Sequence, residues 1–405
     1  MIAAFWLLTI VPVCHIIRPF FGDFHQFYMG GLISATHHWE ALYPIPRVES
    51  HSNPGSINEA DPKPLHNQLA RSRGIDGVGF NFIQLPPVAF LLTPMSWLEP
   101  AEAHWIWLMM LIASGVLISL QAGWLAERCF AQPTRIAGIV TLIAAMSQTM
   151  FRAIRCVNTT ALIGALIGWT ILDLIRGSSI GSAIAIVLAS VLKYIGAAFV
   201  PIALLMRRCK TLLLSAILTA ALFGVTLAIS GPAVFKEFFK QIAPRLGRST
   251  PILANQSVEG FLVRVTHQFP LDRRLHIALL LTQWLTFVVL LAILARHANK
   301  LRRSPQAVCA ACAMLLSWMM LFSPICWDNY LVYLMPLWGW LAWEATQGKA
   351  RLILALLAIA LAAVNTAGHP RFGMPEPFNS HVMFAMMLTL ALGVARIRSR
   401  DPTVQ

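Results

Sequence analysis

The sequence predicts an all-α integral membrane protein that forms one membrane-embedded domain over residues 1–405. Of its 405 residues, 57% are hydrophobic and 12% are charged, whereas about 25% of the residues in a soluble domain are charged. Apolar runs of about 17–25 residues, the length that crosses a bilayer as a helix, recur along almost the whole chain. Together these observations predict a bundle of about 12 transmembrane helices.

The first apolar run, residues 1–20, is expected to be a retained transmembrane span. No charged segment precedes it and no clear small-x-small cleavage site follows it, which is unlike a secretory signal peptide. Residues 21–101 then form a long and less apolar first loop. Within this loop we expect an amphipathic helix at 24–42 and an irregular segment at 44–79, which is rich in Pro, Asn, Ser and Gly.

Residues 84–98 are apolar but short, and Pro86, Pro87 and Pro94 interrupt them. Their length favours a helix that lies at the membrane interface over a complete crossing. Residues 179–206 contain Lys193-Tyr194 and form either one long tilted helix or two short helices that meet near Lys193. Further spans are expected at 102–126, 135–151, 157–175, 179–193, 194–206, 211–230, 275–296, 305–322, 328–346, 350–367 and 381–397, with a second long loop at 231–274.

The charge pattern predicts the orientation of these spans. Lys and Arg total 31 against 17 acidic residues, a formal net charge of +14. With the N-terminus inside and 84–98 at the interface instead of crossing the bilayer, the inner turns are short and basic, as at Arg207-Arg208 and Arg302-Arg303. Both termini are then cytoplasmic in a plasma (inner) membrane, and both long loops are extracytoplasmic. We attribute the charge excess to topology and anionic membrane lipids rather than to nucleic acid, because no soluble basic domain is present.

Several cations fall on the outer side against this rule. Arg152, Arg155, Lys193 and Arg264 lie close to predicted span ends. They belong either to a solvated loop face or to a basic pocket for an anionic group such as a lipid phosphate. Lys193 lies in apolar sequence, where a cation is costly and marks a candidate functional site.

Two aspartates follow predicted spans at their outer ends. Asp23 comes directly after the first span, and a carboxylate held there beside a hydroxyl group could accept its proton. Position alone favours the other interpretation, an ordinary helix-end or N-cap aspartate. Asp328, in FSPICWDNY, is either a site residue or the N-cap of the following span, and Asn255-Gln256-Ser257 with Glu259 and Arg264 forms a polar cluster in the second loop.

No metal site or nucleotide cofactor is expected. The side chains of His37 and His38 point to different faces of a helix, and Cys309 and Cys312 have no neighbouring His or Cys pair, so the two cysteines are interpreted as small core residues. The seven cysteines imply no disulfide framework. The sequence contains neither a P-loop nor a dinucleotide-binding motif.

Six segments occur in an order that resembles a known family. They are FGDFHQFYMGGLISATHHWEALY (21–43); Phe80-Asn81-Phe82 with Leu85-Pro86-Pro87 and Thr93-Pro94; Cys156-Val157-Asn158; Leu192-Lys193; Asn255-Gln256-Ser257-Val258-Glu259-Gly260 with Arg264; and Ser323-Pro324-Ile325-Cys326-Trp327-Asp328. Together they resemble glycosyltransferase family 87, GT-C-fold enzymes that include polyprenyl-phosphate-mannose-dependent mannosyltransferases. Arg155-Cys156 stands where the family has Gly-Gln, and Asn329-Tyr330 stands where it has His-His.

This resemblance implies a GT-C-type bundle and an inverting, metal-independent transfer of a hexose, with mannose as the first candidate. The donor would be a polyprenyl-phosphate sugar, used as a co-substrate without a cofactor, and the acceptor a lipid or glycan on the extracytoplasmic side. Asp23 would be the general base. Donor phosphate would be bound by Arg152, Arg155, Lys193 and Arg264, and substrate by Tyr28, Trp39, Tyr43, Asn158, Asn255, Gln256, Trp327 and Asp328.

Two other functions are consistent with parts of the sequence. A transporter or flippase for a lipid-linked glycan would show internal repeats and ion-coupling acids inside the spans. We find no convincing repeat, and only Asp173 and Glu344 approach span interiors. A non-catalytic binding protein for lipid-linked glycans is the second alternative, which the departures at 155–156 and 329–330 suggest.

Overall fold

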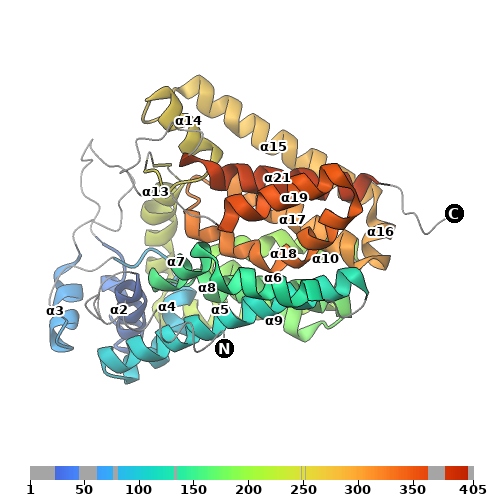
Figure 1. Cartoon of the computed structure of the whole chain (residues 1–405). Helices are drawn as coiled ribbons and strands as arrows, with labels where there is room; N and C mark the ends of the chain where they lie inside the picture. The colour runs from blue at the N-terminus through green and yellow to red at the C-terminus, as the bar shows by residue number, and fades with distance from the viewer. Residues whose placement is uncertain are drawn as a thin grey trace.

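The protein is an all-helical bundle. The computed structural model describes residues 23–44, 62–75, 81–131, 135–247, 249–250, 252–363 and 379–399. Of these residues 82% are helical, and within them no strand forms beyond one isolated antiparallel bridge, between Asn255 and Trp327 (Figure 1). This confirms the predicted all-α class. The expected first span, residues 1–20, lies outside the described residues.

Four described helices are long and apolar enough to cross a membrane: α5 (Pro100–Phe130), α11 (Cys209–Ser230), α15 (Arg273–Arg296) and α21 (His381–Arg398). A fifth span results if α6 (Arg135–Met146) and α7 (Gln148–Arg155), bent by 45° at Ser147, are taken as one. The Ser147 hydroxyl accepts a hydrogen bond from the Met150 amide at 3.2 Å and so starts α7 as a separate helix. The count of about 12 spans therefore stays a prediction.

The remaining helices of the bundle are shorter. They are α8 (Thr160–Arg176), α9 (Ile180–Lys193), η4 (Ile195–Ala198), α10 (Phe199–Leu205), α16 (Ala298–Arg303), α17 (Pro305–Leu321) and α19 (Lys349–Ala363). Residues 328–346, expected as one span, instead form η6 (Asp328–Tyr333), η7 (Met335–Leu337), α18 (Trp338–Glu344) and η8 (Ala345–Gln347). Pro336 lacks the amide hydrogen that a continuous helix would need there.

The stretch 179–206 consists of two short helices, the second of the two predicted alternatives. The chain leaves α9 at Tyr194, whose φ of 44° is left-handed. It then turns back, so that Gly196 packs directly against the Ile186 carbonyl and Ser190 of α9, where a larger side chain would clash. This reversal places Lys193 and Tyr194 at the end of the bundle rather than within a continuous helix.

The first loop folds into short helices that pack on the bundle. They are α2 (Phe24–Ala35), η1 (Trp39–Ala41), α3 (Pro64–Ser72), α4 (Pro86–Leu91) and η3 (Thr93–Trp97). The expected amphipathic helix at 24–42 is wrong in two respects. The helix ends at Ala35, before the left-handed His37, and it is buried on all sides from Phe24 to Ser34.

Contacts from α3, α4, η3 and α5 surround α2 and explain its burial. Gly30 lies against the Phe82 ring and Gly31 against the Leu92 backbone, and a Cβ at either position would clash. The segment 44–79 is not irregular throughout either, because α3 begins at Pro64, which suits a first helical position. In 84–98, Pro86 begins α4 and Pro94 is the second residue of η3.

The second loop contains α12 (Pro232–Glu237), the π-helical turn η5 (Phe238–Ile242), α13 (Ala243–Leu246) and α14 (Val258–Thr266). Lys63 joins it to the first loop by donating to Glu237 at 2.7 Å. The Tyr43 and Phe238 rings, with centroids 5.8 Å apart, add a second contact between the loops. In Figure 1, α2, α3 and α13 gather at one side of the bundle. The two loops therefore meet over the same end of the helices.

Candidate functional site

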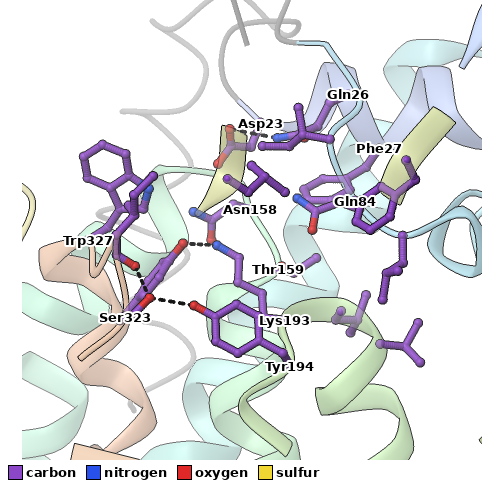
Figure 2. A pocket seen from close by; sticks show the side chains of 18 residues that line it. Asp23, Gln26, Phe27, Gln84, Asn158, Thr159, Lys193, Tyr194, Ser323 and Trp327 are labelled. Atoms are coloured by element: carbon purple, nitrogen blue, oxygen red, sulfur yellow. Dashed lines mark hydrogen bonds between the residues drawn. The ribbon is translucent and has the colours of Figure 1, made fainter. Parts of the chain in front are cut away.

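A cavity of about 280 Å³ lies where these loops meet the bundle. It collects side chains from α2, the segment before α4, the start of α8, the end of α9, the second loop and the segment after α17 (Figure 2). Its polar lining is Asp23, Gln26, Gln84, Asn158, Thr159, Lys193, Tyr194, Ser323 and Tyr330, and its apolar lining is Phe27, Ile83, Leu85, Val191, Leu192, Phe238, Leu246, Ile325 and Trp327. Polar groups that converge in an apolar pocket are typical of a small-molecule site.

Asp23 stands at the N-cap position of α2, but no backbone amide of the described first turn of that helix donates to its carboxylate. The carboxylate faces the cavity and accepts a hydrogen bond from the side chain of Gln26, Nε2 to Oδ1, at 3.0 Å. Burial raises the pKa of Asp23, and the positive charge of Lys193 with hydrogen bonds from Asn158 and Gln26 partly opposes this rise. The geometry therefore fits a site carboxylate better than a helix cap.

Asn158 is held at the wall of the cavity by local backbone geometry. Val157 has a left-handed φ of 52°, and its carbonyl accepts a hydrogen bond from the Trp107 indole at 3.0 Å. The Asn158 Oδ1 atom accepts from the Thr160 amide at 2.8 Å, an Asx turn just before α8. This leaves its amide nitrogen for Asp23.

Lys193 ends α9 inside the cavity. Its Nζ donates to the Tyr330 hydroxyl and lies 4.1 Å from the centre of the Tyr330 ring. Asp23 and Lys193 line the same cavity and act on each other electrostatically, yet no direct ion pair joins these two described residues. A cation and a carboxylate thus face a shared space.

The other three predicted phosphate-binding cations do not line this cavity. Arg152 pairs with Asp328 at 2.7 Å; Asp328 is 2% exposed, and neither residue lines the cavity. Arg155 is exposed and does not line the cavity. The side chain of Arg264 is buried and donates to the Asn255 carbonyl at 2.6 Å and to Ser380 Oγ at 3.0 Å. Asp328 therefore serves an ion pair beside the site, not the lining itself.

Asn255 and Gln256, predicted to bind substrate, are completely buried and hold the second loop in place. The Asn255 amide nitrogen donates to Ser249 Oγ and to the carbonyls of Thr250 and Pro324, each at 3.1 Å. Its Oδ1 accepts from the Cys326 amide at 2.9 Å, and the Gln256 amide donates to the Cys326 carbonyl at 2.6 Å. This network positions the adjoining Trp327 at the cavity.

Of the aromatic residues predicted to bind substrate, one lines the cavity and three do not. Tyr28 and Tyr43 are fully buried, and their hydroxyls donate to the carbonyls of Leu98 at 3.0 Å and Gln84 at 2.9 Å. Trp39 is 4% exposed. None of these three lines the cavity, whereas Trp327 does. The first-loop aromatics therefore pack the loop rather than face a ligand.

Several lining residues were missed from the sequence. Ser323 and Tyr330 lie within the predicted segment 322–330, and Tyr194 follows Lys193 directly. The Tyr194 and Ser323 hydroxyls are 2.7 Å apart, and Ser323 donates to the Ile325 carbonyl at 2.8 Å. Gln26 stands one helical turn after Asp23, so spacing alone could have indicated it.

Metal-binding geometry is not found in the described part of the chain, where no three His, Cys, Asp or Glu side chains are grouped. Cys309 and Cys312 are both fully buried in α17, as expected of core residues.

Comparison with known proteins adds the family. A search of curated proteins found no match. The model of glycosyltransferase family 87 matches residues 82–324, more than half of the chain. The matched stretch includes Asn158 and Lys193 of the cavity, while Asp23 precedes it. The chain therefore belongs to glycosyltransferase family 87, a family of membrane glycosyltransferases.

Proposed function

We propose that this protein transfers a hexose, with mannose as the first candidate, from a polyprenyl-phosphate sugar to a lipid or glycan acceptor on the extracytoplasmic face of the plasma membrane. The observation that carries the proposal is the shared cavity of Asp23 and Lys193. These residues are far apart in the sequence, and the fold brings a carboxylate and a cation into one pocket. Inverting sugar transfer needs both groups.

Asp23 acts as the general base in this reaction. Its carboxylate takes the proton of the acceptor hydroxyl as that oxygen forms a bond to C1 of the donor sugar. The bond between C1 and the phosphate oxygen breaks, and its electron pair leaves with the polyprenyl phosphate. Gln26 and Asn158 hold the carboxylate in position. Because burial raises its pKa, Asp23 is a stronger base than a solvent-exposed aspartate.

Lys193 stabilises the leaving phosphate. The negative charge on that phosphate increases as the sugar departs, and a fixed ammonium group in a cavity of low polarity stabilises it. The apolar lining, with Leu85, Leu192 and Phe238 among its members, suits the first isoprene units of the donor. Trp327 is placed to stack on the sugar ring.

The proposed setting is a GT-C-type bundle of about 12 spans with both termini in the cytoplasm. The ends of α9 and α17 and the start of α8 surround the cavity, and the charge pattern places all three outside. The reaction requires no metal or nucleotide in this proposal, because a lipid phosphate is its leaving group.

The test is the set of lipid-linked glycans extracted from a strain that lacks the gene. One glycan should lose a single hexose, and the wild-type chain should restore it. An intact glycan that accumulates in the cytoplasmic leaflet would instead support a flippase. Unchanged glycans in both leaflets would contradict both functions.

A further inference from the structure

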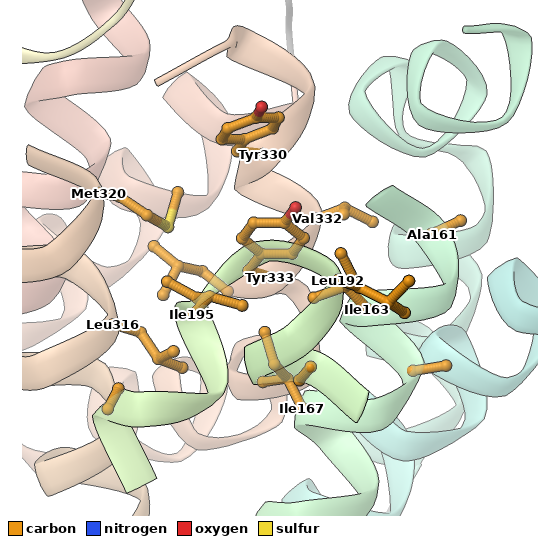
Figure 3. Close-up of a cluster of buried hydrophobic side chains, with 14 of the residues drawn as sticks. Ala161, Ile163, Ile167, Leu192, Ile195, Leu316, Met320, Tyr330, Val332 and Tyr333 are labelled. Atoms are coloured by element: carbon orange, nitrogen blue, oxygen red, sulfur yellow. The ribbon is translucent and has the colours of Figure 1, made fainter. Parts of the chain in front are cut away.

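Tyr330 has a position that the proposed reaction does not yet use. It belongs to η6, is 8% exposed and lines the cavity next to Lys193. Its ring stacks on Tyr333, with centroids 5.4 Å apart and planes at 28°. Figure 3 shows Tyr330 beyond Tyr333, at the edge of the buried cluster that contains Ile195 and Met320. Packing therefore fixes the ring and directs its hydroxyl.

The hydroxyl of Tyr330 makes half of the hydrogen bonds available to it. Its oxygen accepts from Lys193 Nζ. Because an ammonium group can only donate, the hydroxyl hydrogen must find another acceptor. None lies within hydrogen-bond distance among the described residues. A nearly buried O–H group without an acceptor is unfavourable unless a ligand supplies one.

The acidic side chains nearest the cavity already have partners. Asp23 accepts hydrogen bonds from Gln26 and Asn158, and Asp328 pairs with Arg152. The ammonium has donors beyond the one that Tyr330 accepts, and with the hydroxyl hydrogen these line the same cavity. Two adjacent donors, one of them charged, suit an anionic oxygen group.

We propose that Lys193 and Tyr330 form a two-donor site for one phosphate group. In the ligand-free protein the Tyr330 oxygen occupies the place of a phosphate oxygen on Lys193. When a lipid phosphate enters, it displaces this contact, and the hydroxyl donates its hydrogen to a second oxygen of the same phosphate. This inference rests on the proposed lipid-phosphate donor and adds a binding residue to it.

The experiment measures binding of farnesyl phosphate, a short polyprenyl phosphate, and of farnesol to the purified full-length protein in detergent. Tyr330→Phe removes the hydroxyl but keeps the ring that stacks on Tyr333. Tyr333→Phe is the matched control, because it removes a buried hydroxyl that does not line the cavity. Lys193→Met removes the charged donor. Melting temperatures establish that each variant is folded.

Tyr330→Phe should weaken farnesyl phosphate binding about tenfold, the effect of one hydrogen bond to a charged group. Farnesol binding should not change, and Tyr333→Phe should bind both lipids like the wild type. Equal phosphate affinity in Tyr330→Phe and wild type, with loss in Lys193→Met, would overturn the role of Tyr330 and leave the donor proposal standing. A wild-type protein that binds farnesyl phosphate no better than farnesol would contradict both.

Discussion

Asp23 could be interpreted from the sequence as a helix cap, and its surroundings in the structure fit a site carboxylate better. From sequence position an N-cap was the favoured explanation, and the backbone does place Asp23 at that position. Its carboxylate, however, accepts hydrogen bonds from Gln26 and Asn158 and faces a cavity that also holds Lys193. Asp272, by contrast, caps its own helix by accepting from the Arg274 amide at 2.9 Å. The two aspartates share a helix position and differ in what their carboxylates can do.

The raised pKa of Asp23 predicts the acidic limb of the pH profile. The rate needs the carboxylate form, so kcat/KM should fall as pH falls through the pKa of Asp23. Because burial raises this pKa, the inflection should lie above 3.8, the ordinary value for aspartate. Transfer rates of the purified protein between about pH 3 and 8 measure it.

The variant Gln26→Leu tests whether this inflection belongs to Asp23. It removes a hydrogen bond that lowers the pKa of Asp23, so the inflection should move to higher pH. A profile whose position does not respond to Gln26→Leu, or whose inflection lies at or below 3.8, would contradict the assignment of Asp23.

At the scale of elements, the sequence predicted where polar motifs occur but not which of them face the ligand. Lys193 was identified because a cation in apolar sequence is costly, and this physical signal is local. The resemblance to the family assigned Arg264 to donor phosphate and Asn255 to substrate. Their side chains instead satisfy buried carbonyls of neighbouring loop segments. Contacts between segments far apart in the chain decide this, and no local pattern contains them.

Contacts between distant segments also explain why the helix predicted in the first loop is buried instead of amphipathic. The prediction of an amphipathic helix at 24–42 assumed that one face would meet water. Helices α3, α4, η3 and α5, which come later in the chain, fold around α2 and bury all of its faces. The small residues Gly30 and Gly31 allow this close approach.

Asn255 should therefore matter for stability rather than for chemistry. Asn255→Ala removes its bonds to Ser249, Thr250, Pro324, Ser257 and Cys326 and leaves buried groups without partners. We expect a loss of about 3 kcal/mol, seen as a lower melting temperature in detergent.

Asn299→Ala, at an exposed position, is the control and should leave the melting temperature nearly unchanged. An Asn255→Ala protein that melts like the wild type but fails to bind donor would show that the residue contacts substrate after all.

At the scale of the whole molecule, composition and the long apolar runs predicted a membrane protein, and runs of this length cross a bilayer as helices. The all-α class follows from that. The number of spans is less accessible. The apolar sequence is divided into short helices by breaks at Ser147 and Tyr194 and by the 3-10 turns at 328–333 and 335–337. Whether each short helix crosses the membrane depends on how it packs in the bundle. The charge distribution still predicts the orientation of the bundle, because the orientation depends on the total Lys and Arg content of the inner turns and not on any single turn.

This orientation can be tested by thiol labelling in intact cells. Gln268→Cys lies in the second loop, at an exposed position, and should react with a membrane-impermeant maleimide. The native and exposed Cys209, at the start of α11, should react only after the membrane is permeabilised. The opposite pattern would place the cavity in the cytoplasm and contradict the extracytoplasmic reaction.

The central claim is that Asp23 is the base of a sugar transfer in the cavity it shares with Lys193. It is tested most directly by the rate at which purified protein transfers hexose from a polyprenyl-phosphate sugar to its acceptor. Asp23→Asn should lower this rate by about 10²–10⁴-fold with an unchanged melting temperature, while Asp272→Asn should retain it. A rate for Asp23→Asn within a few-fold of the wild type would contradict the claim.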